Sequence, residues 1–261
     1  MRRKNKKIKW KNIILVFIFL VCLITLIISI TNIVIWRLDS NKTNKQIKKI
    51  QENINIEDVY DNNDAEKYIK MNQLNVNFSE LKKINSNTKG WIQVNGTNIN
   101  YPFVQESNNK YYLNHSFDNS YNRAGWVFLD YRNDINSLSK NTIIYAHGRI
   151  DTTMFGSLKN ILKSEWLNNP SNYIIKLSTE TDYTQWQVFS VYRIPTTSDY
   201  IKVDFSSNNE FVNWTNMLIN RSVYNFNTKL NENDYVLTLS TCYNDNDKVV
   251  LHAKLITKEN R

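Results

Sequence analysis

The sequence is poor in cysteine and histidine, two residue types that often serve as nucleophiles and bases in catalysis. Among 261 residues there are only two cysteines and three histidines. Cys22 lies inside a long apolar run and Cys242 lies near the end of the chain, so the two are not expected to pair. A fold stabilised by disulfides is therefore excluded. Cys242 remains a lone thiol, which is either buried and inert or retained for its chemistry.

Acidic residues are absent from the N-terminal tail, and this absence explains the charge of the whole chain. The formal net charge is +9, but seven basic residues lie before residue 12, and removing these seven leaves only +2. A basic tail beside an almost neutral body does not provide the basic face that nucleic-acid binding requires. No nucleic-acid partner is expected.

Charged residues are also absent from residues 13–36, a run of 24 positions. With a rise of about 1.5 Å per residue, a helix of this length spans the roughly 30 Å hydrocarbon core of a membrane. A secretory signal peptide is the alternative, but its apolar region is about 7–15 residues long and ends in small residues. Here the run ends in Ile33-Val34-Ile35-Trp36. We expect a single-pass anchor in the cell membrane, with the N-terminus cytoplasmic and the rest of the chain extracellular, because the basic residues precede the anchor.

Four segments follow from these patterns. They are a cytoplasmic basic tail at 1–12, the transmembrane anchor at 13–36, a polar stalk with N-terminal helices at 37–73, and a folded extracellular domain at 74–261.

Short apolar runs separated by turn residues predict a mostly β domain. Asn95-Gly96 is the strongest hairpin signal in the chain. The predicted strands cover residues 91–94, 98–104, 125–129, 142–145, 173–177, 186–194, 235–239 and 249–256. Helices are predicted at 78–84, with Ser79 as the cap, and at 153–162 and 211–222. Many short strands with few helices favour a closed β-barrel.

Cys242 is the candidate nucleophile because it closes the apolar strand and precedes the polar loop 243–247. A thiol at the end of a strand can meet solvent and substrate. The alternative is a small buried hydrophobic residue. A reactive thiol needs a cation or an imidazole beside it, because the thiolate is the nucleophile.

The three histidines are the candidate bases. His147 stands just after the strand at 142–145, where a turn begins. His115 lies in a loop or short helix and is expected to be a surface residue. His252 lies on the strand that follows Cys242 and shares a face with Lys248, so a place near the site is also conceivable. These local arguments favour His147 over His252 only modestly.

Several motifs in the same order resemble those of sortases, and most closely the class B sortases. Thr-Leu-Ser-Thr-Cys at 238–242 resembles the catalytic strand of that family, and residues 143–148 resemble its histidine segment. The likeness covers about residues 74–258, and the helix at 211–222 is similar to one that class B members insert between late strands. The other matching segments are 90–92, 99–102, 111–114, 124–125, 128–133 and 154–155.

The resemblance implies a sortase-type closed β-barrel and a two-step transfer of an acyl group. Cys242 would cleave a C-terminal sorting motif after its Thr and form a thioacyl-enzyme, with His147 as general acid and then general base. An amine of peptidoglycan or of another surface protein such as a pilin would resolve the thioester. No cofactor or metal is implied. Class B relatives favour motifs of the type Asn-Pro-x-Thr.

The sequence departs from the family at one catalytic position. Where the family has Arg at the start of the strand after the Cys loop, Lys248 stands here. Lysine keeps the charge but lacks the planar fork of arginine. Arg149 and Arg193 are weaker alternatives for this role, and Lys248 could also be an ordinary solvated residue.

The residues that match the family's substrate groove come from three parts of the chain. Each of them could instead serve barrel or loop packing, above all Leu113 and Ile201. The six candidates are Asn109, Leu113, Thr196, Tyr200, Ile201 and Ser240.

Two functions besides transpeptidation remain open. A sortase-like binding protein with little catalysis would bind peptide even without its thiol. A cysteine peptidase would hydrolyse peptides without joining them to an amine.

Overall fold

The structure is a computed structural model that describes residues 10–53, 56–59 and 73–261. Most of the predicted basic tail and part of the predicted stalk therefore lie outside the described residues. The chain divides into two compact units, one up to Lys42 and one from Thr43 to Arg261. The segment boundaries predicted from the sequence remain predictions.

The first unit is the apolar part of α1 (Trp10–Asn53). Its most apolar window has a mean hydropathy of 3.4 and none of that window is buried, so the helix is long and apolar enough to cross a membrane. Hydroxyl groups along it donate to carbonyls of the preceding turn, which satisfies them without water. These bonds run from Thr25 to Cys22, from Ser29 to Thr25 and from Thr31 to Ile27.

The last turns of α1 belong to the second unit. Thr43 is fully buried and accepts a hydrogen bond of 3.0 Å from Asn122 Nδ2. Ile50 is buried in the main core, and Gln51 Nε2 donates to the carbonyl of Asn100 at 3.0 Å. Residues that the sequence placed in a polar stalk thus pack against the β domain.

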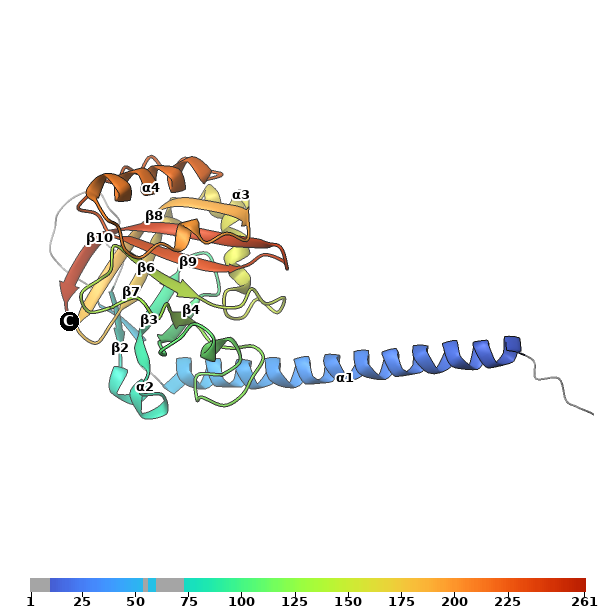
Figure 1. Ribbon diagram of the computed structural model, residues 1–261. Helices are drawn as coiled ribbons and strands as arrows, with labels where there is room; N and C mark the ends of the chain where they lie inside the picture. The colour runs from blue at the N-terminus through green and yellow to red at the C-terminus, as the bar shows by residue number, and fades with distance from the viewer. Residues whose placement is uncertain (1–9, 54–55, 60–72) are drawn as a thin grey trace, which may run out of the picture. The chain divides into compact units, whose positions relative to one another are not determined.

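Eight strands close into a barrel in the order β10-β8-β7-β3-β4-β5-β6-β9 (Figure 1). This confirms the predicted mostly β, closed-barrel fold. The strands are β3 (Thr88–Val94), β4 (Asn100–Val104), β5 (Phe128–Leu129), β6 (Asn141–Tyr145), β7 (Ile174–Ser178), β8 (Asp182–Pro195), β9 (Val236–Cys242) and β10 (Asp247–Asn260). Neighbours pair antiparallel except β4 with β5 and β6 with β9, which are parallel. The predicted turn after β3 forms, with Gly96 at φ +70 and the Val94 amide bonded to the Ile99 carbonyl.

The helices that follow α1 are shorter and lie between the strands. They are α2 (Phe78–Ile84), α3 (Ser164–Leu167), α4 (Asn208–Arg221) and the 3-10 helices η1 (Tyr111–Leu113), η2 (Gly156–Leu162), η3 (Pro170–Tyr173) and η4 (Asp199–Ile201). The predicted cap of α2 was wrong: Asn77, not Ser79, accepts the Glu80 amide, and Ser79 donates its hydroxyl to Asn77. The segment predicted as a helix from 153 begins only at Gly156.

Two apolar clusters hold the domain together. The larger one fills the barrel around Trp91, Phe103 and Trp186, all fully buried. The smaller one lies between α4 and the outer face of β8, where Phe211, Trp214 and other large side chains pack on the strand. Burial of each such side chain contributes roughly 1.5–3 kcal/mol. Both clusters reach the cleft described below, through Phe128 of the larger cluster and Tyr200 of the smaller one.

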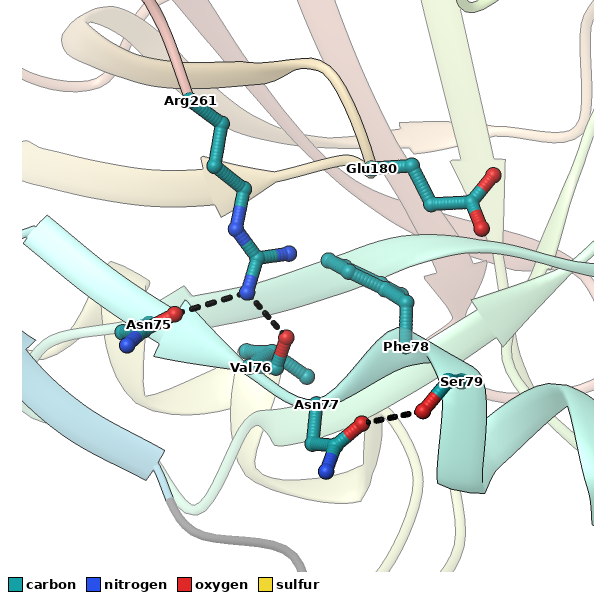
Figure 2. A pocket seen from close by; sticks show the side chains of 7 residues that line it. All are labelled: Asn75, Val76, Asn77, Phe78, Ser79, Glu180 and Arg261. Carbon is teal, nitrogen blue, oxygen red and sulfur yellow. Dashed lines mark hydrogen bonds between the residues drawn. The ribbon is translucent and has the colours of Figure 1, made fainter.

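The small sheet of β1 (Ile56–Val59) and β2 (Gln73–Val76) is tied to the end of the last barrel strand. Figure 2 shows the Arg261 guanidinium, which donates to Asn75 Oδ1 at 2.7 Å and to the Val76 carbonyl. Its carbon centre also lies 4.9 Å from the ring centre of Phe78. A pocket between β2, the start of α2 and Arg261 is drawn in Figure 2, and these contacts explain it as part of the packing between these elements.

Candidate active site

Two parallel strands bring the candidate nucleophile and base together. Cys242 ends β9, and His147 follows the end of β6, which pairs with β9 so that Tyr145 lies beside Ser240. Just beyond that pair, Thr241 Oγ1 donates to the Ala146 carbonyl at 2.7 Å. Because the two strands run in the same direction, their carboxyl ends meet at one edge of the barrel.

Gly148 allows the closest approach of these two strand ends. A Cβ atom at this position would lie 2.0 Å from the carbonyl oxygen of Cys242. No side chain can occupy that space without moving backbone. The segment after His147 therefore lies directly against the backbone of the nucleophile.

Cys242 faces Lys248 across the hairpin of β9 and β10. The two residues are direct partners in the register, and Lys248 Nζ lies 2.9 Å from Cys242 Sγ. Cys242 is exposed, so the alternative of a buried, inert thiol is wrong. An ammonium group that donates to sulfur stabilises a negative charge there.

His147 is oriented by a carbonyl group on another segment. Its Nε2 lies 2.7 Å from the carbonyl oxygen of Leu113. A carbonyl oxygen only accepts, so Nε2 carries the hydrogen and Nδ1 is the basic nitrogen of the neutral ring. The ring is half-buried, which leaves it open to the cleft.

All nine site residues that the sequence predicted line one cleft of about 740 Å³. Cys242, His147 and Lys248 lie in it together with Asn109, Leu113, Thr196, Tyr200, Ile201 and Ser240. The hydroxyl groups of Tyr200 and Ser240 lie 3.0 Å apart, and burial raises the pKa of Tyr200. The volume of the cleft lies within the range of about 300–1,000 Å³ that is typical of ligand-binding clefts.

Six further residues line the same cleft and were not predicted. They are Phe128, Tyr145, Ala146, Thr197, Ser198 and Thr241. A signal was present in the sequence, since each is next to or within two residues of a predicted site residue or lies in a segment that resembles the family. Tyr145 donates its hydroxyl to Asp130 Oδ2 at 3.0 Å, and Asp130 is fully buried.

The other two histidines have structural surroundings. His252 is fully buried, and its two ring nitrogens lie 2.8 Å from the Tyr192 hydroxyl and 2.9 Å from the Thr238 hydroxyl. Burial lowers its pKa to about 3, with Arg221 adding to the effect. It does not line the cleft, although its ring centre lies 6.3 Å from that of Tyr200, which does. His115 stacks on Tyr111 at 4.0 Å between ring centres and is partly buried.

The two alternative arginines are engaged elsewhere. Arg149 pairs with Asp151 at 2.8 Å and its side chain is only 8% exposed. Arg193 pairs with Asp247, and its carbon centre lies 4.0 Å from the ring centre of Tyr243. Neither lines the cleft, whereas Lys248 does. Among the described residues, no group of three or more His, Cys, Asp or Glu side chains could hold a metal ion.

Comparisons with known proteins agree on one family. The family model described as Sortase domain matches residues 92–256. Sortase B of Staphylococcus aureus is 36% identical over 183 residues, which cover 69% of this chain and 74% of that protein. Sortase B of Listeria monocytogenes is 36% identical over 185 residues, with the same coverage.

Solved structures agree with the sequence comparison. The crystal structure of sortase B from B. anthracis superposes with a TM-score of 0.69 at 34% identity, covering 84% of this chain and 99% of that one. The barrel, the exposed thiol at the end of β9 and these relatives lead to one assignment. The chain belongs to the sortase family and is a cysteine transpeptidase of the class B type.

Proposed function

We propose that this protein cleaves a C-terminal sorting motif after its Thr residue and joins the new carboxyl end to an amine of the cell wall or of another surface protein. The observation that supports this most is the placement of Cys242, Lys248 and His147 in one open cleft, with Lys248 Nζ 2.9 Å from the thiol sulfur.

In the first step, Cys242 Sγ attacks the carbonyl carbon of the scissile peptide bond. The carbon–sulfur bond forms, the carbon–nitrogen bond breaks, and protonated His147 gives its proton to the leaving amine. Lys248 stabilises the thiolate and then the oxyanion that forms on the carbonyl oxygen.

In the second step, an amine attacks the thioester. His147, now neutral, takes the proton of the incoming amine, the carbon–sulfur bond breaks and the thiolate is restored. The thioester preserves the acyl activation of the peptide bond, so the exchange needs no nucleotide and no metal.

The six groove residues would bind the peptide on the acyl side of the scissile bond. Leu113 and Ile201 offer apolar contacts, while Asn109, Thr196, Tyr200 and Ser240 offer hydrogen-bonding groups around the same cleft. The apolar segment at 13–36 would anchor the enzyme with its N-terminus in the cytoplasm. The catalytic unit would then work at the outer face of the membrane, where sorted proteins and wall amines meet.

Intact-mass measurement tests this proposal. The full chain in detergent is mixed with a panel of peptides of the type Asn-Pro-x-Thr, with and without triglycine or a diamine, beside Cys242→Ala. A mass gain confined to the Cys242 protein, followed by release of an amine-linked product, is the expected result. Cleavage that added amine does not divert would indicate a hydrolase. Binding without any adduct would indicate a binding protein.

A further inference from the structure

The wall of the cleft at residues 199–202 is held by side chains that reach it from other elements. This segment contains the three-residue η4 and lies between β8 and α4. Its four consecutive carbonyl oxygens each accept a side-chain hydrogen bond. Trp214 Nε1 donates to Asp199 at 2.9 Å, Arg132 Nη2 donates to Ile201 at 3.1 Å, and Asn141 Nδ2 donates to Tyr200 at 3.3 Å and to Lys202 at 2.9 Å.

Asn141 makes two of these four bonds. It is fully buried at the start of β6, and its Oδ1 accepts the Thr238 hydroxyl at 2.7 Å. This bond fixes the direction of the amide, since the reversed amide would place its oxygen against two carbonyl oxygens. Buried polar groups of this kind stabilise one geometry because any alternative leaves them without partners.

A buried chain of hydrogen bonds holds Asn141 from behind. Thr238 donates its hydrogen to Asn141, so it accepts from His252 Nδ1, and His252 Nε2 then accepts from the Tyr192 hydroxyl. The depressed pKa of His252 keeps its ring neutral, which this direction requires. The wall of the cleft is thereby connected, through Thr238 on β9 and His252 on β10, to Tyr192 on β8.

Arg132 connects the same wall to the segments that carry Asn109 and Tyr145. It holds the buried carboxylate of Asp130 with two bonds, at 2.9 Å from Nε and 2.7 Å from Nη2. Asp130 Oδ2 also accepts from Asn109 Nδ2 and from the Tyr145 hydroxyl, each at 3.0 Å. Asn109 and Tyr145 line the cleft, whereas Asp130 and Arg132 do not.

We propose that Asn141 and Arg132 are positioning residues that fix the place of the 199–202 wall relative to Asn109 and Tyr145, and so set the affinity for the acyl-donor peptide. They act through Tyr200, Ile201, Asn109 and Tyr145, which line the cleft. The identity of the bound peptide rests on the proposed function; the positioning itself rests on the hydrogen bonds.

Peptide affinity in the full chain carrying Cys242→Ala tests the proposal without catalysis. The probe is the member of the Asn-Pro-x-Thr panel that binds most tightly, labelled for fluorescence anisotropy. Arg132→Lys keeps a positive charge beside Asp130 but removes the fork that also reaches the Ile201 carbonyl. We expect Kd to rise about fivefold to tenfold, as for the loss of one intramolecular hydrogen bond. Arg123→Lys is the matched control, because Arg123 is exposed and does not line the cleft, and its Kd is expected to be unchanged.

The buried chain is tested with a pair of variants at Thr238. Thr238→Val removes the hydroxyl that orients Asn141 and is expected to raise Kd, while Thr238→Ser retains the hydroxyl and restores affinity. The same substitutions are then made in the catalytically competent chain that retains Cys242. There, Arg132→Lys and Thr238→Val should each raise KM by a similar factor and leave kcat within about twofold of the parent. The rate at which iodoacetamide alkylates the Cys242 thiol should be unchanged. Thermal unfolding of each variant shows that it is folded.

Two results would overturn the proposal: equal Kd for Arg132→Lys and Arg123→Lys, or a fall in kcat with KM unchanged. A parent chain that binds peptide but forms no acyl-enzyme would refute the transpeptidation mechanism instead. The comparison of Kd values would still decide the positioning role.

Discussion

Cys242 Sγ and Lys248 Nζ lie 2.9 Å apart on directly opposed residues of β9 and β10. The short loop 243–246 makes this pairing, because it turns the chain back immediately after the nucleophile. Lysine offers a compact charge with three donors, and in this geometry one donor already meets the sulfur.

Lys248 is expected to be the cation that transpeptidation uses. Lys248→Met should lower kcat about 10²–10³-fold, as for loss of an oxyanion donor, and should slow alkylation of Cys242 by iodoacetamide. Lys248→Arg should retain or raise activity, because arginine restores a fork at the same register position. The rate of thioacyl-enzyme formation in a single turnover measures the effect of both variants. A strong loss in Lys248→Arg would show that this site is built around lysine.

His147 is expected to be the general acid and base. Removing it should lower turnover by about 10²–10⁴-fold, because no other described histidine lines the cleft. His147→Gln retains a donor toward the Leu113 carbonyl, so the loop should keep its place. Steady-state kinetics with the best peptide gives the rate, and thermal unfolding gives the control. Full turnover in His147→Gln would show that His147 is not the general acid or base.

The strand ends were predictable from the sequence, while the contacts between distant segments were not. An apolar strand that closes on Cys242, and another that closes before His147, point to a shared edge of a barrel. The role of Asn141 was not visible, since an asparagine at the start of a strand is ordinary turn chemistry. Its partners at 200 and 202 come from a segment about 60 residues later.

His252 shows the limit of strand alternation in another way. It shares a face with Lys248 by period, and the sequence therefore left it open as a second base. In the fold, α4 covers that part of β8 and β10 and completes a buried cluster around Tyr192 and Trp214. Burial by a helix on the outer face of a barrel follows from tertiary packing, which the period of a strand does not encode.

Gly148 is expected to be indispensable for the geometry of the nucleophile. In Gly148→Ala the new Cβ would lie 2.0 Å from the Cys242 carbonyl oxygen, and that oxygen is backbone that cannot rotate away. The strand end must shift, so we expect acyl-enzyme formation to fall at least about 10²-fold, since small misplacements of reacting groups have effects of that order. The single-turnover assay measures this rate. Gly156→Ala is a useful comparison: it clashes with the Arg149 carbonyl at 2.1 Å but lies outside the cleft. An equal loss in both variants would indicate a general effect on folding.

The buried His252 should make the folded state sensitive to mild acid. Its folded pKa of about 3 lies below the ordinary value of 6.5, so between these values the unfolded chain binds more protons than the folded one. The free energy of unfolding therefore falls as the pH drops below about 6.5, by about 2 kcal/mol between pH 7 and pH 5. Denaturant unfolding of the full chain in detergent, followed by tryptophan fluorescence at the two pH values, measures the difference. His252→Gln should be less stable at pH 7 but should lose most of this pH dependence, whereas His115→Gln should keep it. An unchanged pH dependence in His252→Gln would mean that another group is responsible, and that the buried chain behind Asn141 does not depend on a neutral imidazole.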